Sequence, residues 1–259
     1  MSRNFSTPKK DGIFLKKRLG QNLLTDKNII KKIINSITFD KNDTVLEIGP
    51  GLGAITLEMS LKVKKIVCVE KDKDMAEELK KKVGDNVEII NANALDFIKD
   101  NHLKKYRVVA NIPYYITSPI IRGLLESKNY PEDIYLMIQK EVGQRICAKP
   151  GDMSLLSVSV QYYATPKILF NVSKNSFFPS PKVDSVFIQL KPKKVPQNDD
   201  FLKLVKMGFS HPRKKLTNNL ENKEVVENWL KKNNMSAGER AENLTLGQWE
   251  DLFNLMKKP

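Results

Sequence analysis

Between residues 27 and 138, short runs rich in β-branched residues alternate with stretches whose apolar residues have helical spacing. In residues 27–36, for example, isoleucines recur at the three- and four-residue intervals of one helix face. Helices are also predicted at residues 54–61 and 73–83. The runs that we predict as strands are residues 44–48, 66–70, 87–90, 107–110 and 134–138. Continuous apolar strands separated by helices are typical of a largely parallel sheet covered on both faces, so the predicted fold class is α/β.

The pattern changes after residues 150–151, a Pro-Gly turn. The apolar runs at residues 155–163 and 183–190 are predicted as two further strands, added antiparallel at the edge of the sheet. Residues 191–198 are charged, contain proline and lack periodicity, which indicates a linker. Only helices are predicted beyond it, at residues 201–208, 213–220, 223–232 and 246–257, the last with Thr245 as N-cap. We therefore predict an α/β domain, residues 1–190, and a small all-helical domain, residues 198–259.

The chain has a large excess of positive charge, with 44 Lys and Arg against 30 Asp and Glu and a formal net charge of +14. Such an excess attracts a polyanion and makes its binding depend on salt. The same composition also arises where lysine only fills solvated helix faces, and the total leaves both interpretations open. Dense basic clusters at residues 16–18 and 213–215, which flank possible functional segments, favour the polyanion.

Several classes of protein are disfavoured by the composition. No run approaches the roughly 20 apolar residues of a membrane-spanning helix. Residues 1–10 are polar and lack the apolar run of a secretory signal, so we expect a cytoplasmic location. Cys68 and Cys147 lie far apart inside apolar segments and are interpreted as buried reduced thiols. With only His102 and His211 beside them, no metal site is expected.

A glycine-rich turn joins the first predicted strand to the helix that follows. Gly49 and Gly51 let the backbone turn tightly and approach a ligand without an intervening Cβ. Glu70 ends the next predicted strand, where its carboxylate can accept both ribose hydroxyls of a nucleoside. Asn93 follows the third strand, where its side-chain oxygen can accept a hydrogen bond from an adenine amine. These residues are candidates for cofactor binding, although a tight turn without a ligand would contain the same glycines.

The spacing of the glycines bears on which cofactor this turn would hold. Dinucleotide-binding turns follow G-x-G-x-x-G, whereas the glycines here run G-x-G-x-G, and Ala54 takes the last position of the dinucleotide pattern. Since alanine is also allowed there, this argues only mildly against NAD. Glu47 and Pro50 resemble instead the first motif of class I (Rossmann-like) methyltransferases, whose cofactor is S-adenosyl-L-methionine. The segment after the fourth strand decides for the methyltransferase interpretation.

That segment is Asn111, Ile112, Pro113 and Tyr114, at the carboxyl end of the sheet, where open α/β folds bind ligands. Methylation of an adenine amine needs the nitrogen lone pair, which is delocalised into the ring. The Asn111 amide oxygen and the Ile112 carbonyl can accept the two amine hydrogens and favour an sp3-like nitrogen. Pro113 stiffens the turn, and Tyr114 offers a ring on which an extruded base can stack. Because the sulfonium leaving group needs no general acid, catalysis is expected to consist mainly of positioning.

Phe177 and Phe178 precede a second rigid turn, residues 179–181. One of the two rings could stack on the target base while the other packs in the core. We assign the base-stacking role to Phe177.

Four segments together resemble the ribosomal RNA adenine dimethyltransferase family: residues 17–24, 49–53, 111–117 and 177–185. Its two bacterial branches are KsgA (also called RsmA), which acts on small-subunit RNA, and the Erm enzymes, which act on large-subunit RNA. Three further segments resemble the KsgA branch more closely: residues 139–151, 213–220 and 240–244. The resemblance extends from about residue 14 to residue 253.

The resemblance implies dimethylation of two adjacent adenosines in a hairpin loop near the 3′ end of small-subunit (16S) ribosomal RNA, with the 30S subunit as partner. It also implies cofactor contacts at Asn22, Leu24, Gly49, Glu70, Asn93 and Asn111. Asn93 stands where the family usually has Asp, and an asparagine accepts without charge assistance, so slightly weaker cofactor binding is predicted. The candidates for phosphate contacts are Lys16, Lys17, Arg18, Arg213, Lys214 and Lys215.

Three alternatives stay open at this point: an Erm-type enzyme, a DNA adenine methylase with the same chemistry, and a non-catalytic ribosome-assembly factor. The lack of a separate target-recognition domain disfavours DNA, and an intact Asn111 and Tyr114 disfavour the non-catalytic factor. We expect a cytoplasmic monomer that binds S-adenosyl-L-methionine and small-subunit RNA, without a metal or a membrane.

Overall fold

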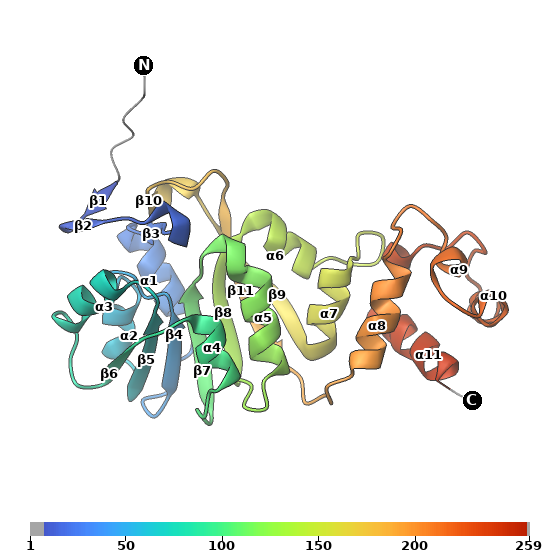
Figure 1. Ribbon diagram of the computed structural model, residues 1–259, viewed down its shortest axis with the longest axis horizontal. Coiled ribbons are helices and arrows are strands. Elements are labelled where there is room, and N and C mark those ends of the chain that lie inside the picture. The colour runs from blue at the N-terminus through green and yellow to red at the C-terminus, as the bar shows by residue number, and fades with distance from the viewer. Residues whose placement is uncertain (1–7, 258–259) are drawn as a thin grey trace, which may run out of the picture. The chain divides into compact units, whose positions relative to one another are not determined.

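The structure is a computed structural model that describes residues 8–257, apart from the side chain of Lys17. It divides into two compact units. The first consists of the chain up to Gly143 together with Lys167–Pro192, and the second of Gln144–Pro166 and the chain from Lys193 onward. The long strands, drawn as arrows in Figure 1, belong to the first unit except for residues 164–166. Most of the N-terminal segment that we expected to be polar, residues 1–10, lies outside the described residues.

A seven-stranded sheet with the strand order β6-β5-β4-β7-β8-β11-β9 forms the centre of the first unit. The strands are β4 (Thr44–Ile48), β5 (Lys65–Glu70), β6 (Val87–Asn91), β7 (Tyr106–Asn111), β8 (Asp133–Gln139), β9 (Ala164–Val172) and β11 (Ser185–Pro192). Neighbouring strands from β6 to β8 are parallel, and β11 pairs antiparallel with β8. The predicted fold class, a largely parallel α/β sheet with an antiparallel addition, is confirmed.

The order of the strands positions a ligand site. From β4 the chain continues to β5 and β6 on one side, and then to β7 and β8 on the other, so the winding reverses between β4 and β7. Ligands of open α/β sheets bind in the crevice at such a reversal, outside the carboxyl ends of the strands. Ile48 pairs with Ala110, so the residues that follow them, Gly49 and Asn111, lie at the same level at the carboxyl end of the sheet.

Helices cover both faces of the sheet. In the first unit they are α1 (Lys27–Ser36), α2 (Thr56–Ser60), α3 (Lys73–Lys80), α4 (Ala94–Lys99), α5 (Thr117–Glu126) and most of α6 (Lys140–Ile146). Val45 on β4 belongs to the main core cluster with Ile33 of α1 and Met59 of α2. Leu46, the next residue, is also fully buried, and successive strand residues point to opposite faces. The continuous apolar strands of the sequence therefore reflect burial on both faces.

Several short elements complete the first unit. They are β1 (Lys9–Lys10), β2 (Ile13–Phe14), β3 (Leu23–Leu24), β10 (Phe177–Phe178) and the 3-10 turns η1 (Lys17–Leu19), η2 (Tyr114–Ile116) and η3 (Lys174–Ser176). The pairing that matters for the site is that of β3 with β10, which joins the N-terminal segment to the loop before β11.

One prediction was wrong: residues 155–163 form helix α7 (Leu155–Tyr163), not a strand. Their valines and tyrosines suggested a strand, but the signal that decides is local. The Ser154 side chain accepts from the backbone of Ser157, and the Ser157 side chain closes the reciprocal half of a capping box. The true strand, β9, begins at Ala164. Gln144–Pro166, which the sequence placed in the predicted domain of residues 1–190, groups with the second unit.

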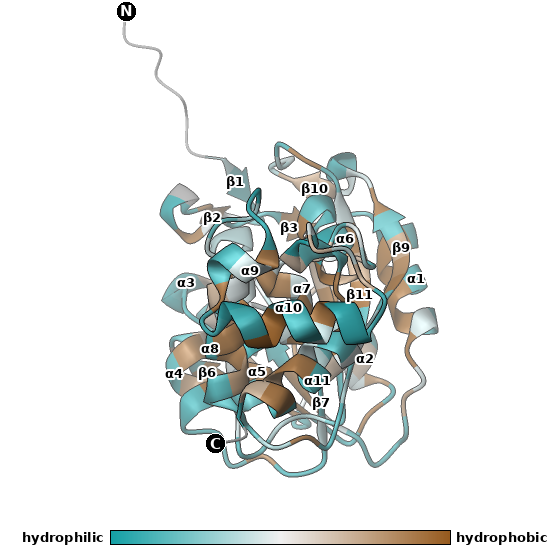
Figure 2. Ribbon diagram, turned by 90° about the vertical axis from the view of Figure 1, so that its right-hand side faces the viewer, coloured by the Kyte–Doolittle hydropathy of each residue, from teal (hydrophilic) through white to brown (hydrophobic). Residues whose placement is uncertain are grey.

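The rest of the second unit is helical, as expected for residues 198–259. Its elements are α8 (Asp199–Gly208), α9 (Leu216–Asn219), α10 (Lys223–Lys232), α11 (Leu246–Met256) and η4 (Ala241–Asn243). Trp249 is fully buried, and the Trp229 indole donates to Asp251 over 2.6 Å. Figure 2 shows hydrophilic and hydrophobic residues interspersed along α10 and α11. Within residues 8–257, no helix is long and apolar enough to cross a membrane.

Candidate functional site

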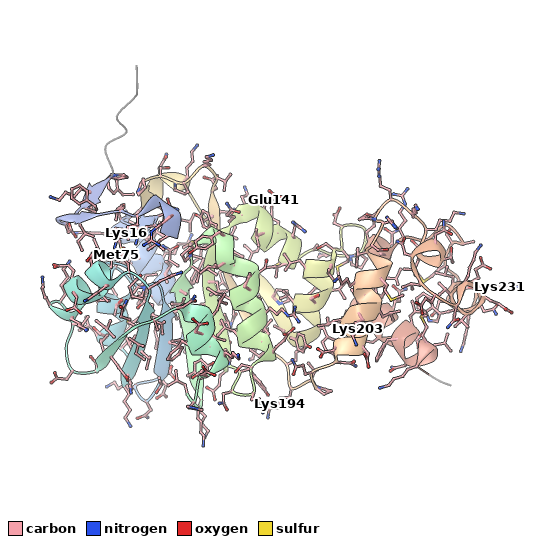
Figure 3. All side chains as sticks on the ribbon, viewed as in Figure 1. Lys16, Met75, Glu141, Lys194, Lys203 and Lys231 are labelled. Carbon is pink, nitrogen blue, oxygen red and sulfur yellow. The ribbon has the colours of Figure 1, made fainter. Side chains whose placement is uncertain are left out.

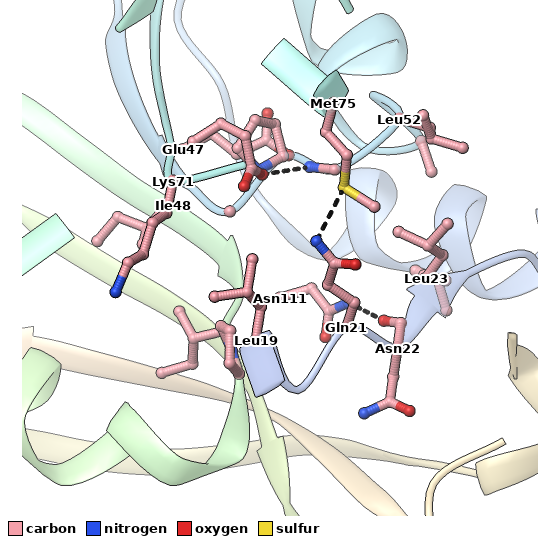
Figure 4. A pocket seen from close by; sticks show the side chains of 18 of the residues that line it. Leu19, Gln21, Asn22, Leu23, Glu47, Ile48, Leu52, Lys71, Met75 and Asn111 are labelled. Atoms are coloured by element: carbon pink, nitrogen blue, oxygen red, sulfur yellow. Dashed lines mark hydrogen bonds between the residues drawn. The ribbon is translucent and has the colours of Figure 1, made fainter. Parts of the chain in front are cut away.

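A cavity of about 420 Å³ opens at the carboxyl ends of β4, β5 and β7, where the winding of the sheet reverses. Its wall is built from the glycine-rich turn, the end of β5, the start of α4, residues 111–116 and the N-terminal segment around β3. Figure 4 looks into this cavity, where Gln21, Met75 and Asn111 come together from separate parts of the chain. The predicted cofactor residues all line it: Asn22, Leu24, Gly49, Gly51, Glu70, Asn93 and Asn111.

The glycines of the turn are required by both conformation and space. Gly49, Gly51 and Gly53 have φ values of +66°, +57° and +86°, a region that other residues rarely adopt. A Cβ on Gly53 would lie 2.4 Å from the Leu79 side chain, and one on Gly51 would lie 2.9 Å from Leu23. The turn therefore brings its backbone close to both α3 and the N-terminal segment, and the role predicted for it, a close approach to a ligand, stays a prediction.

Glu70 is the acidic group of the cavity. Its two carboxylate oxygens accept from the backbone amides of Gly51, at 3.1 Å, and Asp72, at 2.8 Å. Burial raises the pKa of Glu70, although these two amides counteract the shift. Each oxygen keeps a second lone pair, so the carboxylate is held in one orientation and can still accept hydroxyl donors.

Asn93 lines the cavity and also caps a helix. Its side-chain oxygen accepts from the amide of Leu95 at 3.0 Å and caps the N-terminus of α4. An amide oxygen has two lone pairs, so the cap leaves one free for a ligand amine. The cap also fixes which end of the amide faces Leu95, because only the oxygen can accept.

Asn111 is oriented by the N-terminal segment. Its side-chain nitrogen donates to the backbone carbonyl of Asn22 at 3.1 Å. A carbonyl can only accept, so this bond forces the amide to present its NH2 to Asn22 and leaves the Oδ1 atom for a ligand. This is the orientation that accepting an amine hydrogen requires.

Tyr114 is held from the other side of the site. Its hydroxyl lies 2.7 Å from the hydroxyl of Ser185, a fully buried residue at the start of β11. Burial raises the pKa of Tyr114. Ile112 is buried, and Pro113 has a φ of −57°, so the turn between Asn111 and Tyr114 is tight and fixed.

The two phenylalanines do not lie as predicted. Phe177 is 4% exposed and belongs to the main core cluster, whereas Phe178 is 38% exposed. Phe177 pairs with Leu24 across β10 and β3 and does not line the cavity. Its ring would have to leave the core to stack on a base.

The predicted phosphate-binding residues differ in whether they form ion pairs within the protein. The Lys16 amine bonds to Asp72 and Asp74, at 2.5 and 2.8 Å, which occupies it within the protein. Arg18 is exposed, and the side chain of Lys17 lies outside the described part of the chain. Arg213, Lys214 and Lys215, in the second unit, are exposed, and no ion pair of theirs is found among residues 8–257.

Three residues that the sequence analysis missed complete the site: Gln21, Asp72 and Ser185. Gln21 lies within the segment that carried the family resemblance, but its partner Asp72 is 51 positions away. Ser185 is separated from Tyr114 by 71 positions. Only the fold brings these pairs together, and no spacing in the sequence signals them. Within the described part of the chain, no group of three metal-ligating side chains is found.

A parallel sheet with a cavity at its point of reversal, a glycine-rich turn and an oriented Asn-Ile-Pro-Tyr segment defines a Rossmann-like methyltransferase. Within this class, residues 14–258 match the family model described as "Ribosomal RNA adenine dimethylase". The chain belongs to this family.

Individual relatives are similar to this protein over nearly the whole of its chain. A Ribosomal RNA small subunit methyltransferase A from Mycoplasmopsis synoviae is 43% identical, over 93% of this chain and 96% of the relative. The protein of the same name from Fusobacterium nucleatum is 40% identical, over 93% and 97%. Among solved structures, a dimethyladenosine transferase from Plasmodium falciparum has a TM-score of 0.75 and 28% identity, over 89% of this chain and 95% of that one. The 23S rRNA methyltransferase ErmE has a TM-score of 0.74 and 25% identity, over 92% and 100%.

Proposed function

We propose that this protein transfers methyl groups from S-adenosyl-L-methionine to the N6 amines of two adjacent adenosines near the 3′ end of small-subunit ribosomal RNA. The observation that carries the proposal is the orientation of Asn111, whose NH2 is held by Asn22 so that its oxygen is left for the amine. The choice of the small subunit is supported by the names of the relatives that are 40% and 43% identical. The activity would serve the assembly of the 30S subunit in the cytoplasm.

The cavity fits the proposed cofactor in chemistry as well as in size. The Glu70 carboxylate can accept ribose hydroxyls, and the Asn93 oxygen can accept the adenine amine. The backbone of Gly49 and Gly51 approaches without a Cβ, and a volume of about 420 Å³ lies within the range of small-molecule sites. When bound, S-adenosyl-L-methionine supplies an electrophilic methyl group on a positively charged sulfur.

The residues of the chain then act by positioning. The Asn111 oxygen and the Ile112 carbonyl accept the two hydrogens of the adenine amine, which draws the nitrogen toward an sp3 geometry and frees its lone pair. The Tyr114 ring, fixed by Ser185, supports the face of the base. Holding the amine in line for attack reduces the entropy that the reaction must lose in the transition state. Transfer leaves a positive charge on the methylated nitrogen, and its proton passes to water, because loss of the proton returns the lone pair to the aromatic ring.

The units are assigned different parts of this function. Cofactor binding and methyl transfer belong to the first unit, which contains the whole cavity. The exposed cluster Arg213, Lys214 and Lys215 of the second unit would contact RNA phosphates. We expect the protein to act as a monomer.

The test is methyl transfer from labelled S-adenosyl-L-methionine to small subunits that lack the modification, to large subunits and to duplex DNA. We expect label only on small-subunit RNA, as N6,N6-dimethyladenosine at two adjacent positions, and none with Asn111→Ala. Label confined to large-subunit RNA would assign the Erm activity instead. Binding to small subunits without transfer to any substrate would identify a non-catalytic assembly factor.

Cofactor binding can be tested apart from transfer. If Asn93 accepts the adenine amine, Asn93→Asp adds charge to that hydrogen bond and keeps the N-cap of α4. Titration calorimetry should then show tighter binding of S-adenosyl-L-methionine by the variant. An unchanged or weaker affinity would refute this contact.

A further inference from the structure

The N-terminal segment of residues 16–25, which we call the strap, forms one wall of the cavity. It carries Asn22, whose carbonyl orients Asn111. The strap is bound at both ends to other parts of the first unit. At its far end, β3 pairs with β10, and the amide of Thr25 donates to the carbonyl of Ser176 at 2.9 Å. At its near end, a cluster of polar side chains connects it to the loop between β5 and α3.

The centre of that cluster is the carboxylate of Asp72, whose side chain has no exposed surface. One of its oxygens accepts from the Lys16 amine at 2.5 Å and the other from the Gln21 amide at 2.7 Å. The Gln21 oxygen in turn accepts from the backbone amide of Lys16 at 2.5 Å, which closes the near end of the strap into a loop. The Gln21 amide also donates to the sulfur of Met75 on α3 at 3.5 Å; Figure 3 labels Lys16 and Met75.

The loop between β5 and α3, residues 70–72, also supports the cofactor side of the cavity. The amide of Asp72 donates to Glu70, and the other Glu70 oxygen accepts from Gly51. Asp72 therefore connects two walls of the cavity: the acidic group at the end of β5 and the strap that orients Asn111.

We propose that Asp72 is a positioning residue for methyl transfer, because its bonds to Lys16 and Gln21 hold the strap where the Asn22 carbonyl can orient the Asn111 amide. The proposal rests on the proposed function and deepens it, since it names the group that keeps the side-chain amide of Asn111 in its catalytic orientation. It also gives Lys16 a structural task in place of a phosphate contact. Asp72 neither lines the cavity nor bonds to Asn111, and it acts through the strap.

The burial of the Asp72 carboxylate, the acidic half of this ion pair, makes the connection strong. Breaking a buried ion pair by removing one partner leaves an uncompensated charge, which is far more disruptive than the loss of a surface pair. Burial by itself would raise the pKa of Asp72, but its bonds to Lys16 and Gln21 outweigh that effect and lower the pKa. Asp74 also contacts Lys16, but its side chain is 65% exposed, so its contribution should be small.

This contrast provides a matched pair of variants, Asp72→Asn and Asp74→Asn. Asparagine at position 72 keeps the N-cap that Asp72 provides for α3, so the helix should remain intact. It removes the charge and leaves one acceptor oxygen where Lys16, Gln21 and the helix cap now share two. Asp74→Asn removes the same charge two residues away.

We expect Asp72→Asn to lower kcat by about 10-fold to 100-fold, since small displacements of a positioning group have effects of this size. The KM for small-subunit RNA should stay unchanged, and Asp74→Asn should retain kcat within about twofold. Lys16→Arg, which can keep the ion pair, should retain activity, whereas Lys16→Met should lose it. Equal kcat values for Asp72→Asn and the unchanged protein, or equal losses in Asp72→Asn and Asp74→Asn, would overturn the proposal.

Two measurements without substrate distinguish this inference from the proposed function. The side-chain amide signals of Asn111 in 15N–1H NMR spectra, identified by their loss in Asn111→Asp, should shift in Asp72→Asn and not in Asp74→Asn. Trypsin should cleave after residues 16–18 faster in Asp72→Asn, because the strap is released there. Unchanged Asn111 signals would refute the positioning role even in an active enzyme.

Shifted signals in a protein that methylates no RNA would instead refute the proposed function and leave the positioning role of Asp72 intact. If Asp72→Asn does not fold, Gln21→Leu takes its place in every measurement, because it removes the Gln21 bonds to Asp72, Lys16 and Met75 and no helix cap.

Discussion

Glu47 is a carboxylic acid in the interior of the first unit, 2% exposed, beneath the glycine-rich turn. One of its oxygens accepts from the Thr56 hydroxyl at 2.7 Å and from the Cys68 thiol. Burial raises the pKa of Glu47 to about 7, and the nearby charge of Glu70 adds to the shift. The group is thus protonated in the folded protein at pH values where it is ionised in the unfolded chain.

The direction of the pH effect follows from this shift. A raised pKa means that the folded state binds the proton more tightly, so the stabilisation is complete below about pH 4.5 and is lost as the pH rises to about 7. Glu47→Gln, which cannot ionise, should remove this part of the pH dependence. Relative to the variant, the unchanged protein should lose about 3 kcal/mol of unfolding free energy between pH 4.5 and pH 7. Urea unfolding of both proteins across this range is the measurement, and parallel curves would show that Glu47 is ionised in the fold.

The hydroxyl of Tyr114 provides a second test at the scale of single residues. Tyr114→Phe keeps the ring but loses the bond to Ser185, and Ser185→Ala removes the same bond from the other side. If that bond only fixes the ring, each variant should lower kcat by the same small factor of about 3 to 10, and the double variant should lose no more than either. Tyr114→Ala, which removes the stacking ring, should cost about tenfold or more in KM for the RNA. Independent, multiplying effects of Tyr114→Phe and Ser185→Ala would assign Ser185 another role.

The sequence predicted the position of those candidate residues that stand at the end of a strand. Glu70 and Asn111 end parallel strands, so the fold class alone brings their side chains to the same edge. Lys16 and Asp72 are 56 positions apart, and the charge of Lys16 indicated only that it could bind an anion. A carboxylate in the same chain satisfies that requirement as well as a phosphate does, and one sequence does not distinguish them.

At the scale of elements, helix α7 shows where a pattern fails. Its run of Leu, Val and Tyr has no polar face because most of the helix is buried, so neither helical nor strand periodicity is visible. The capping box of Ser154 and Ser157 was the available signal. By contrast, α1 and α10 were predicted with their observed bounds, since each is amphipathic and follows a polar residue.

The packing of α8 on α11 in the second unit gives a prediction at this scale. A Cβ on Gly208, the last residue of α8, would lie 2.3 Å from the Trp249 ring, which is fully buried. Gly208→Ala should therefore destabilise the second unit by about 1–3 kcal/mol through overpacking. Gly247→Ala, in the first turn of α11, meets nothing within 4 Å and should stabilise the protein by about 0.5–1 kcal/mol through helix propensity.

Thermal and urea unfolding of the two alanine variants provide the comparison. The same substitution in the same unit should have opposite signs, so a general effect of alanine is controlled within the experiment. Equal stability of both variants would mean that α8 and α11 do not pack through Gly208 and Trp249.

At the scale of the whole molecule, the net charge of +14 has two explanations: a surface that attracts a polyanion, or lysines that only fill solvated helix faces. The structure contains lysines and arginines that fit each of them. Some lysines are paired with acidic neighbours three or four positions away, as Lys80 is with Glu77 and Lys81 with Glu78. Such pairs fit the explanation that lysine fills solvated faces. Arg213, Lys214 and Lys215 are exposed and stand together just before α9, which fits a phosphate-binding cluster.

Two single substitutions distinguish the effect of the local cluster on RNA binding from the effect of the total net charge. Lys214→Ala and Lys231→Ala each reduce the net charge by one, and both side chains are exposed in the second unit. Lys231, labelled in Figure 3, lies on α10, and in sequence it is separate from the predicted cluster. Binding of small-subunit RNA should be measured across a series of salt concentrations, because log K falls linearly with log salt and the slope counts the phosphate contacts.

If the cluster binds phosphate, Lys214→Ala should weaken binding at every RNA sequence tested and reduce the magnitude of the salt slope by about one. Lys231→Ala should leave the slope unchanged, since a charge that makes no phosphate contact releases no counterion when the RNA binds. Equal changes in both variants would mean that the affinity follows total charge and that the cluster has no special role. Because a lost phosphate contact affects binding rather than transfer, kcat at saturating RNA should be the same in all three proteins.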